Sequence, residues 1–361
     1  MKQWIGCSLW FASCAKKNIF GILCFFAAGS MLSADHEIVF PGVEWSQSTP
    51  EKQEMDGMAL DRLAEQIEGR GVVIRNGYVV KHWGAEQRRG DWYSSSNPLF
   101  SSLLFFAIEE GRVGGVQERA GEYLWDFDSK DREIQFSQLA NMTSGYARPE
   151  PSGEAWAYSN FGVQLFHMTL LDRVFNQPAL SVVLGRNRLG PLQFQDRPAL
   201  RERTNTLVAS ARDFGRIAWF WCQKGKWGDR QLLPKHYFDR FMRPHVKIDQ
   251  TVTLQAEDND YLQIGTERDE SEYFGEHGPG IYGYGWWFNA KGRQNANQVT
   301  WPSAPHDTLM SIGIRGNNAV IIPSLNLVLV STYSKWGDFS PGDADSLYNR
   351  YLEELVNAVK R

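Results

Sequence analysis

The chain has 361 residues, of which 42% are hydrophobic, 13% aromatic and 22% charged, and its formal net charge is −4. This composition allows a sizeable buried core and excludes global disorder as the expected state. The mildly acidic balance excludes the basic surface that is typical of nucleic-acid-binding proteins, so we expect no nucleic-acid partner.

The first 34 residues predict an export signal. Lys16 and Lys17 precede an apolar run over residues 19–32, and small residues follow at Ser33 and Ala34. This order is typical of a signal peptide cleaved after residue 34. The apolar run is short for a bilayer span, which disfavours a permanent anchor, although an uncleaved anchor is the alternative. We therefore expect an exported protein, periplasmic or extracellular, with no permanent membrane span.

Cysteine and histidine usage argues against a metal site. Removal of the first 34 residues would leave Cys222 as the single cysteine, and the seven histidines are scattered along the chain. One cysteine forms no intramolecular disulfide, and without a second ligand at suitable spacing it builds no zinc site. We expect no metal and no cofactor.

The first half of the expected domain begins with three elements. Apolar residues recur at helical spacing over residues 58–67 and predict a helix. Residues 71–84 predict a hairpin, because Asn76 and Gly77 are the strongest short signal for a type I′ turn. Residues 94–110 are rich in Leu, Phe and Ala without alternation, which predicts a buried helix.

The remaining elements indicate how the chain closes. Residues from about 115 to 290 read as helices and loops, residues 318–322 and 325–331 as strands, and residues 343–360 as an amphipathic helix. Both chain ends would then share one antiparallel sheet flanked by helices. We predict an α+β fold over residues 35–361, with a mainly helical subdomain inserted into it and a cleft at the junction.

Three short motifs carry residue types suited to acyl-transfer chemistry. Ser94 stands at a helix start, where backbone N–H groups and the helix dipole favour a developing negative charge. Tyr158 can relay a proton and Asn160 can orient a substrate amide. Glycine in the segment Ser311 to Gly313 permits close backbone approach by a ligand. Each motif alone is weak, because a helix cap, a chance tripeptide and a β-bulge explain them equally well.

Together, and in this order, the motifs resemble the serine β-lactamase and penicillin-binding-protein superfamily. The likeness is strongest to the group of class C β-lactamases, D-alanyl-D-alanine carboxypeptidases and esterases, and it spans about residues 58–360. The resemblance implies a β-lactamase-like fold and a serine hydrolase that acts by acyl transfer. The segments that carry it are residues 93–111, 139–145, 158–160, 282–287 and 322–328.

The resemblance also implies roles for individual residues. Ser94 matches the nucleophile, Tyr158 the proton-shuttling tyrosine and Asn160 the asparagine that orients the substrate. The segment Ser311 to Gly313 matches a third motif, which is usually Lys-Thr-Gly or His-x-Gly, but its cation is missing here.

In that register, further residues would complete the binding site. The N–H groups of Ser94 and Ile314 would form the oxyanion hole. Arg315 and His306 are candidates for contacting a substrate carboxylate, although exposed structural roles are the simpler interpretation for both.

One departure from the superfamily pattern bears directly on catalysis. The Ser-x-x-Lys motif is Ser-x-x-Asn in this chain, with Asn97 one helical turn after Ser94. An amide has no usable basicity at neutral pH, and losing general-base assistance costs on the order of 10²- to 10⁴-fold in rate. Lys81 on the predicted hairpin is not an evident replacement, and a histidine base at His277 or His306 is conceivable.

Two functions therefore remain open. The first is a serine hydrolase acting on an amide or ester, such as a peptidoglycan-type peptide, a β-lactam or a small ester, with its rate impaired by the missing lysine. The second is a non-catalytic ligand-binding protein, a pseudoenzyme of the same fold. Retention of Ser94, Tyr158 and Asn160 favours the first, whereas Asn97 and the missing third-motif cation favour the second.

Overall fold

The computed structural model describes residues 37–253, 259–265 and 274–360. The chain divides into two units, Met1–His36 and Glu37–Arg361. The expected signal peptide falls within the first unit and lies outside the described residues. Everything that follows concerns the second unit.

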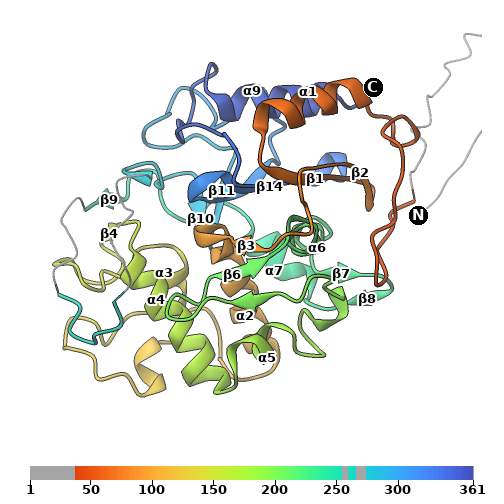
Figure 1. Cartoon of the computed structure of the whole chain (residues 1–361). Coiled ribbons are helices and arrows are strands. Elements are labelled where there is room, and N and C mark those ends of the chain that lie inside the picture. Colours follow the sequence, from red (N-terminus) through yellow and green to blue (C-terminus); the bar gives the residue numbers. More distant parts are fainter. Residues whose placement is uncertain (1–36, 254–258, 266–273, 361) are drawn as a thin grey trace, which may run out of the picture. The chain divides into compact units, whose positions relative to one another are not determined.

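A seven-stranded antiparallel sheet is the main structural feature of the second unit (Figure 1). Its strand order is β10-β11-β12-β13-β14-β1-β2, so β1 from the start of the unit pairs with β14 from its end. Both chain ends thus share one sheet, and the predicted α+β fold is confirmed. The strands are β1 (Arg70–Arg75), β2 (Tyr78–Trp83), β10 (Tyr282–Gly283), β11 (Trp286–Phe288), β12 (Leu309–Gly313), β13 (Asn317–Ile322) and β14 (Leu327–Thr332).

The hairpin formed by β1 and β2 has the predicted turn. Asn76 has φ 53° and Gly77 has φ 91°, so both central residues are left-handed as a type I′ turn requires. Strands β13 and β14 are joined by a short 3-10 turn, η7 (Pro323–Leu325), which ends at Asn326 in a left-handed conformation. These local signals set the register of the sheet.

Helices cover both faces of the sheet. Helices α1 (Gly57–Ile67) and α9 (Leu347–Asn357) pack together on one face, and α6 (Ala211–Cys222) lies against β1, β13 and β14 on the other (Figure 1). Helix α1 begins where the Asp56 carboxylate accepts hydrogen bonds from the N–H groups of Met58 and Ala59. The predicted helices at both ends of the domain are confirmed.

The middle of the chain is mainly helical but also contributes to the sheet. Strands β10 and β11 fall inside the range 115–290, for which the sequence predicts only helices and loops, so the helical part ends before residue 282. Two or three residues between glycines are too few to show strand alternation. The other elements are η1 (Glu51–Gln53), β3 (Gly90–Asp91), η3 (Ala120–Tyr123), α3 (Phe136–Ala140), β4 (Ala155–Trp156), α4 (Asn160–Met168), η4 (Thr169–Phe175), α5 (Ala179–Val183), η5 (Gly190–Leu192), β5 (Ala199–Leu200), β6 (Leu207–Ala209), β7 (Lys226–Trp227), β8 (Arg230–Gln231), α7 (Lys235–Phe241), β9 (Thr251–Val252) and η6 (Ile314–Gly316).

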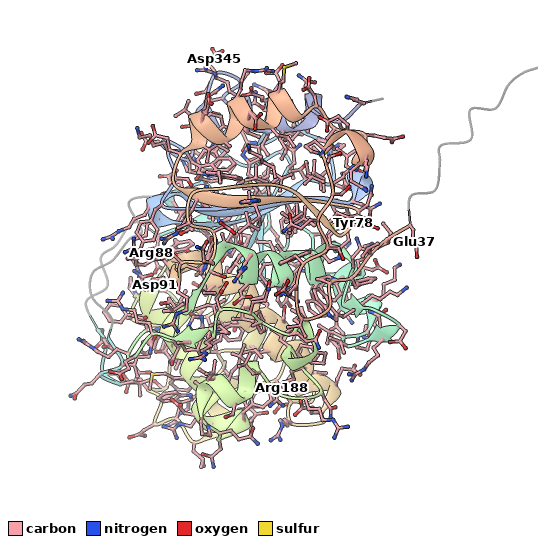
Figure 2. The ribbon with its side chains drawn as sticks, turned by 45° about the vertical axis from the view of Figure 1, so that its right-hand side comes forward. Glu37, Tyr78, Arg88, Asp91, Arg188 and Asp345 are labelled. Atoms are coloured by element: carbon pink, nitrogen blue, oxygen red, sulfur yellow. The ribbon has the colours of Figure 1, made fainter. Side chains whose placement is uncertain are left out.

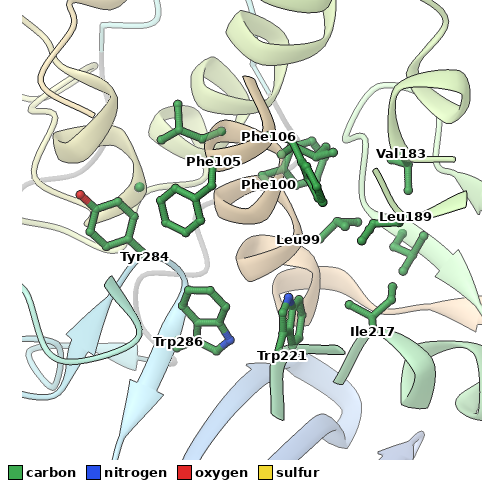
Figure 3. Packing of buried hydrophobic residues seen from close by; sticks show 14 of the residues in the cluster. Leu99, Phe100, Phe105, Phe106, Val183, Leu189, Ile217, Trp221, Tyr284 and Trp286 are labelled. Atoms are coloured by element: carbon green, nitrogen blue, oxygen red, sulfur yellow. The ribbon is translucent and has the colours of Figure 1, made fainter. Parts of the chain in front are cut away.

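A buried helix connects the sheet to the helical part. The predicted helix over residues 94–110 begins as a 3-10 turn, η2 (Tyr93–Ser96), and continues as α2 (Asn97–Glu109). Pro98 lies in the first turn of α2, where its missing N–H leaves no hydrogen bond unmade. Apolar side chains of α2 pack against α5, α6 and the β10–β11 region (Figure 3). This packing fixes the position of the turn that carries Ser94.

Candidate active site

Three consecutive serines form the turn before α2, and they differ in what their hydroxyls contact. The Ser95 hydroxyl donates to the carbonyl of Asn317, and the Ser96 hydroxyl accepts a 2.9 Å hydrogen bond from the N–H of Leu207. The half-buried Ser94 makes no side-chain hydrogen bond with any residue in the described ranges. Ser94 is therefore the member of the turn whose hydroxyl is left for a ligand.

The backbone immediately before Ser94 is strained. Tyr93 has φ 46°, a left-handed conformation that is unfavourable for an aromatic residue. The Asp91 carboxylate accepts a 2.8 Å hydrogen bond from the N–H of Tyr93 and helps to hold this conformation. Strain of this kind is retained in folded proteins mainly at ligand and catalytic sites.

The structure brings Asn97 and Tyr158 into contact. Asn97 is the first residue of α2, and its Nδ2 donates to the Tyr158 hydroxyl oxygen at 3.0 Å. Tyr158 lies between β4 and α4, and Ser159 caps α4 by accepting from the N–H of Gly162 at 3.1 Å. Asn160 is half-buried at the first position of that helix. Two of the three predicted catalytic positions thus meet directly.

Aromatic side chains enclose Tyr158, which is only 2% exposed. The Phe274 ring centroid lies 4.3 Å away, and the rings of Trp287 and Tyr282 lie at 6.3 Å. The pKa of Tyr282 is well above its usual range because the hydroxyl is buried, and Tyr158 adds to the shift while the nearby Asn97 side chain opposes it. The Tyr282 hydroxyl has no hydrogen-bond partner of good geometry among the described residues.

The sequence did not single out Phe274 and Tyr282 as contacts of Tyr158. Residues 282–287 are one of the segments that carry the resemblance, and the structure places them against the start of α2. Gly285 has φ 88°, and a Cβ there would lie 2.7 Å from the nitrogen of Pro98. The Tyr284 N–H donates to Asn141 Oδ1 at 2.9 Å, so two of the resembling segments meet at the start of α2.

The third motif lies beside the serine turn. A Cβ on Gly313 would approach the carbonyl oxygen of Trp92 to 2.8 Å and the nitrogen of Ser95 to 2.9 Å, so only glycine allows this contact. Ser311 is fully buried in β12, and its hydroxyl has no partner among the described residues. Ile314 is half-buried in the turn that follows β12. The end of β12 therefore packs against η2.

The alternative basic residues lie elsewhere. Lys81 forms an ion pair with Asp61 of α1. His306 is exposed before the start of β12, whereas Gly313 at the other end of that strand contacts the serine turn. His277 is half-buried against Phe339, at a ring-centroid distance of 5.7 Å, and burial lowers its pKa. None of the three has a contact with Ser94 within the described ranges.

Comparison with solved structures identifies the fold. A putative 6-aminohexanoate-dimer hydrolase from Bacillus anthracis matches with a TM-score of 0.59 and 14% identity over 85% of this chain and 86% of its own. A β-lactamase from Mycobacterium bovis gives a TM-score of 0.60 and 16% identity over 84% and 100%. A β-lactamase/D-alanine carboxypeptidase from Yersinia pestis gives 0.56 and 16% over 86% and 100%.

The chain has the β-lactamase-like fold. At these identities the likeness to β-lactamases and penicillin-binding proteins shows the fold alone. Neither a family model nor a curated protein sequence matches the chain. The fold is therefore recognised by comparing three-dimensional structures, and not by comparing the sequence with family models or curated proteins.

No helix among residues 37–253, 259–265 and 274–360 is both long and apolar enough to cross a membrane. Within the same residues, no group of three or more His, Cys, Asp or Glu side chains is placed to hold a metal ion.

Proposed function

We propose that this chain is an exported, non-catalytic member of the β-lactamase-like fold, which binds an ester or amide ligand at Ser94 without turning it over. The observation that carries the proposal is the 3.0 Å hydrogen bond from Asn97 Nδ2 to the Tyr158 hydroxyl. An amide occupies the position at which acylation needs a proton acceptor. Export follows from the signal peptide expected in the first 34 residues.

The chemistry of acyl transfer shows why this arrangement opposes turnover. Attack by Ser94 requires transfer of its hydroxyl proton as the new C–O bond forms. Asn97 cannot accept that proton, and its N–H already donates to the Tyr158 oxygen. Without a base, the rate should fall by about 10²- to 10⁴-fold relative to a complete site. Lys81, the nearest lysine along the chain, is occupied by Asp61.

Slow acyl transfer is a second candidate, and one observation favours it. The Ser94 hydroxyl has no hydrogen-bond partner among the described residues, whereas Ser95 and Ser96 are engaged with the backbone. Ser94 is thus free to attack, and the N–H groups at the start of a helix favour the resulting oxyanion. The names of the matching structures point to amide bonds and β-lactams as the substrate class.

Labelling experiments separate the two candidates. Full-length protein and the Ser94→Ala variant are treated with a fluorescent penicillin and with a fluorophosphonate, and adducts are measured by intact mass. Equilibrium binding of the penicillin is followed in parallel by fluorescence anisotropy. The proposal predicts saturable binding to both proteins and no adduct. An adduct that forms with the intact protein and not with Ser94→Ala would replace it with the second candidate, and absence of both binding and labelling would refute both.

A further inference from the structure

Asn317 is the first residue of β13, and its side chain is fully buried. Its amide offers two N–H donors and an oxygen that can accept two hydrogen bonds. Nδ2 donates to the carbonyl of Asp91 at 3.1 Å and to that of Ile314 at 2.9 Å. Oδ1 accepts from the Thr332 hydroxyl and from the N–H of Tyr333 at 3.2 Å. This one side chain therefore uses all four of its hydrogen-bonding positions.

The hydrogen bonds of Asn317 join segments that are distant in sequence. Asp91 ends β3 just before the serine turn, Ile314 begins η6 after β12, and Thr332 ends β14. Asp91 lies just below the sheet in Figure 2, on the side of the helical part. The carbonyl of Asn317 adds a further bond, because it accepts from the Ser95 hydroxyl. Asn317 thus ties the serine turn to the end of the sheet.

The contacts of Asn317 lie on both sides of Ser94. They hold the chain at Asp91 before Ser94 and at Ser95 directly after it. The Asp91 carboxylate extends this hold, since it accepts a 2.8 Å hydrogen bond from the N–H of Tyr93. The position of Ser94 therefore depends on Asn317 through the residues that flank Ser94.

Three residues with left-handed backbone conformations lie at the points that Asn317 holds. Tyr93, Arg315 and Tyr333 have φ values of 46°, 60° and 54°. The N–H of Tyr333 donates to the amide directly, Arg315 follows the bonded carbonyl in η6, and Tyr93 is held by the carboxylate at the end of β3. A residue other than glycine keeps this conformation only where its surroundings impose it. Asn317 supplies bonds at or beside all three residues, so it helps to impose the strain.

An amide is the side chain that these surroundings require. An aspartate at position 317 would have the same shape but no N–H, so both carbonyls would lose their donor. An apolar side chain would leave several buried polar groups without a partner, which is unfavourable. The sheet approaches the turn closely here, since a Cβ on Gly313 would lie 2.9 Å from the nitrogen of Ser95. Loss of the two donors should therefore loosen the serine turn from η6.

We propose that Asn317 is a positioning residue for the ligand site at Ser94. It sets the distance between the serine turn and η6, the two segments whose N–H groups would face the carbonyl of a bound ester or amide. The role rests on the proposed function, because it concerns the ligand of the same site. Asn317 acts on that ligand through the backbone around Ser94 and lies outside the motifs that carry the resemblance.

The test compares two neighbouring asparagines. Asn317→Asp keeps the shape of the side chain and removes both donors. Asn318→Asp is the matched control, because Asn318 is equally buried on the same strand but donates at 3.3 Å to Tyr348 of α9. Both variants are made in the Ser94→Ala protein, so that the affinity for the fluorescent penicillin is an equilibrium value. Hydrogen–deuterium exchange of residues 91–96 reports on the turn without any ligand.

Asn317→Asp should speed exchange in residues 91–96 and weaken binding of the penicillin by about tenfold or more. Asn318→Asp should change both quantities by less than about twofold, since its side chain bonds to α9 and not to the turn. Equal effects of the two variants would mean a general loss of stability and would overturn the positioning role, as would unchanged exchange in Asn317→Asp. Faster exchange with unchanged affinity would overturn the link to the ligand site.

A milder variant keeps the test decisive if Asn317→Asp does not fold. Thr332→Val keeps the shape of the side chain and removes only the hydroxyl that donates to Asn317 Oδ1. It should change exchange and affinity in the same direction as Asn317→Asp, and no change in either would overturn the proposal. If the penicillin binds none of the proteins while exchange responds to Asn317 and not to Asn318, the proposed acyl-ligand function fails and the hold on the turn stands.

Discussion

Replacing Asn97 by lysine tests whether the missing base is the reason for the proposed lack of turnover. Asn97 is 7% exposed and lies against Tyr158 at the start of α2, one turn from Ser94. Burial disfavours the charged form of a lysine and lowers its pKa, which increases the fraction able to accept a proton near neutral pH. The Asn97→Lys variant should therefore gain hydrolytic activity.

The expected gain follows from two opposing contributions. A general base accelerates acyl transfer by about 10²- to 10⁴-fold, which corresponds to about 2.7–5.4 kcal/mol. The substitution also removes the hydrogen bond from Asn97 to Tyr158. This bond holds the tyrosine in position and contributes about 1 kcal/mol to the stability of the protein. Because the lost hydrogen bond offsets part of the gain, we expect an increase toward the lower end, about 100-fold; the contact with Phe274 still holds Tyr158 in place.

The assay is hydrolysis of a chromogenic β-lactam and of a p-nitrophenyl ester across pH 6 to 10. Asn97→Gln is the matched control, since it lengthens the side chain without adding a base, and the double variant Ser94→Ala/Asn97→Lys must lose the gain. The rate should rise with pH as the introduced lysine loses its proton. If folded Asn97→Lys protein is no faster than Asn97→Gln, the reasoning is refuted and the cleft itself opposes turnover.

Four further predictions concern stability. Ser94→Ala should leave the free energy of unfolding unchanged in denaturant titrations, whereas Ser95→Ala should lower it by about 1 kcal/mol because its hydroxyl donates to Asn317; equal effects would contradict this contrast. Gly285→Ala should lower the melting temperature, because Gly285 has φ 88° and a Cβ there would collide with Pro98. Gly228→Ala is the steric control, because Gly228 is also left-handed but has open space around it. Arg216→Leu should lower the free energy of unfolding by several kcal/mol, because this fully buried guanidinium donates to the carbonyls of Gly42 and Leu192. An unchanged free energy of unfolding would show that those hydrogen bonds are dispensable. Burial lowers the pKa of His167 to about 3, so between pH 6.5 and 3 the unfolded chain binds a proton that the folded chain does not. The free energy of unfolding should therefore fall as the pH drops through that window, by about 2 kcal/mol at pH 5. His167→Gln should remove this part of the pH dependence.

The sequence predicts those parts of the fold that depend on local signals. Asn76 and Gly77 specify a turn by their backbone conformation alone, and the apolar spacing of residues 58–67 specifies a helix whatever it packs against. The short strands β10 and β11 escaped prediction because their partners are distant in sequence and their length shows no period. Strand identity at such positions is decided by tertiary pairing rather than by propensity.

The candidate site shows the same division. Positions 94, 97 and 158 were predicted together because each belongs to a motif with fixed spacing, and their roles stay predictions. The structure places the side chains of Asn97 and Tyr158 in contact. The surroundings were not predictable, because Phe274 and Tyr282 reach Tyr158 only through the tertiary fold. Arg70, on the first strand of the sheet, reaches Tyr333 in the same way.

Two buried tyrosine hydroxyls lie near Asn97, and a lysine and an asparagine at this position differ in how many of them they can satisfy. Asn97 donates to Tyr158, while the Tyr282 hydroxyl, close enough for Asn97 to influence its pKa, has no well-placed partner among the described residues. An uncompensated buried hydroxyl costs about 1–3 kcal/mol. A lysine has three donors on a longer stem, so one ammonium could reach both tyrosine oxygens, whereas the shorter amide satisfies one of them well. The Tyr282 hydroxyl is therefore a second oxygen that a longer donor could satisfy, and we expect Asn97→Lys to be tolerated by the fold.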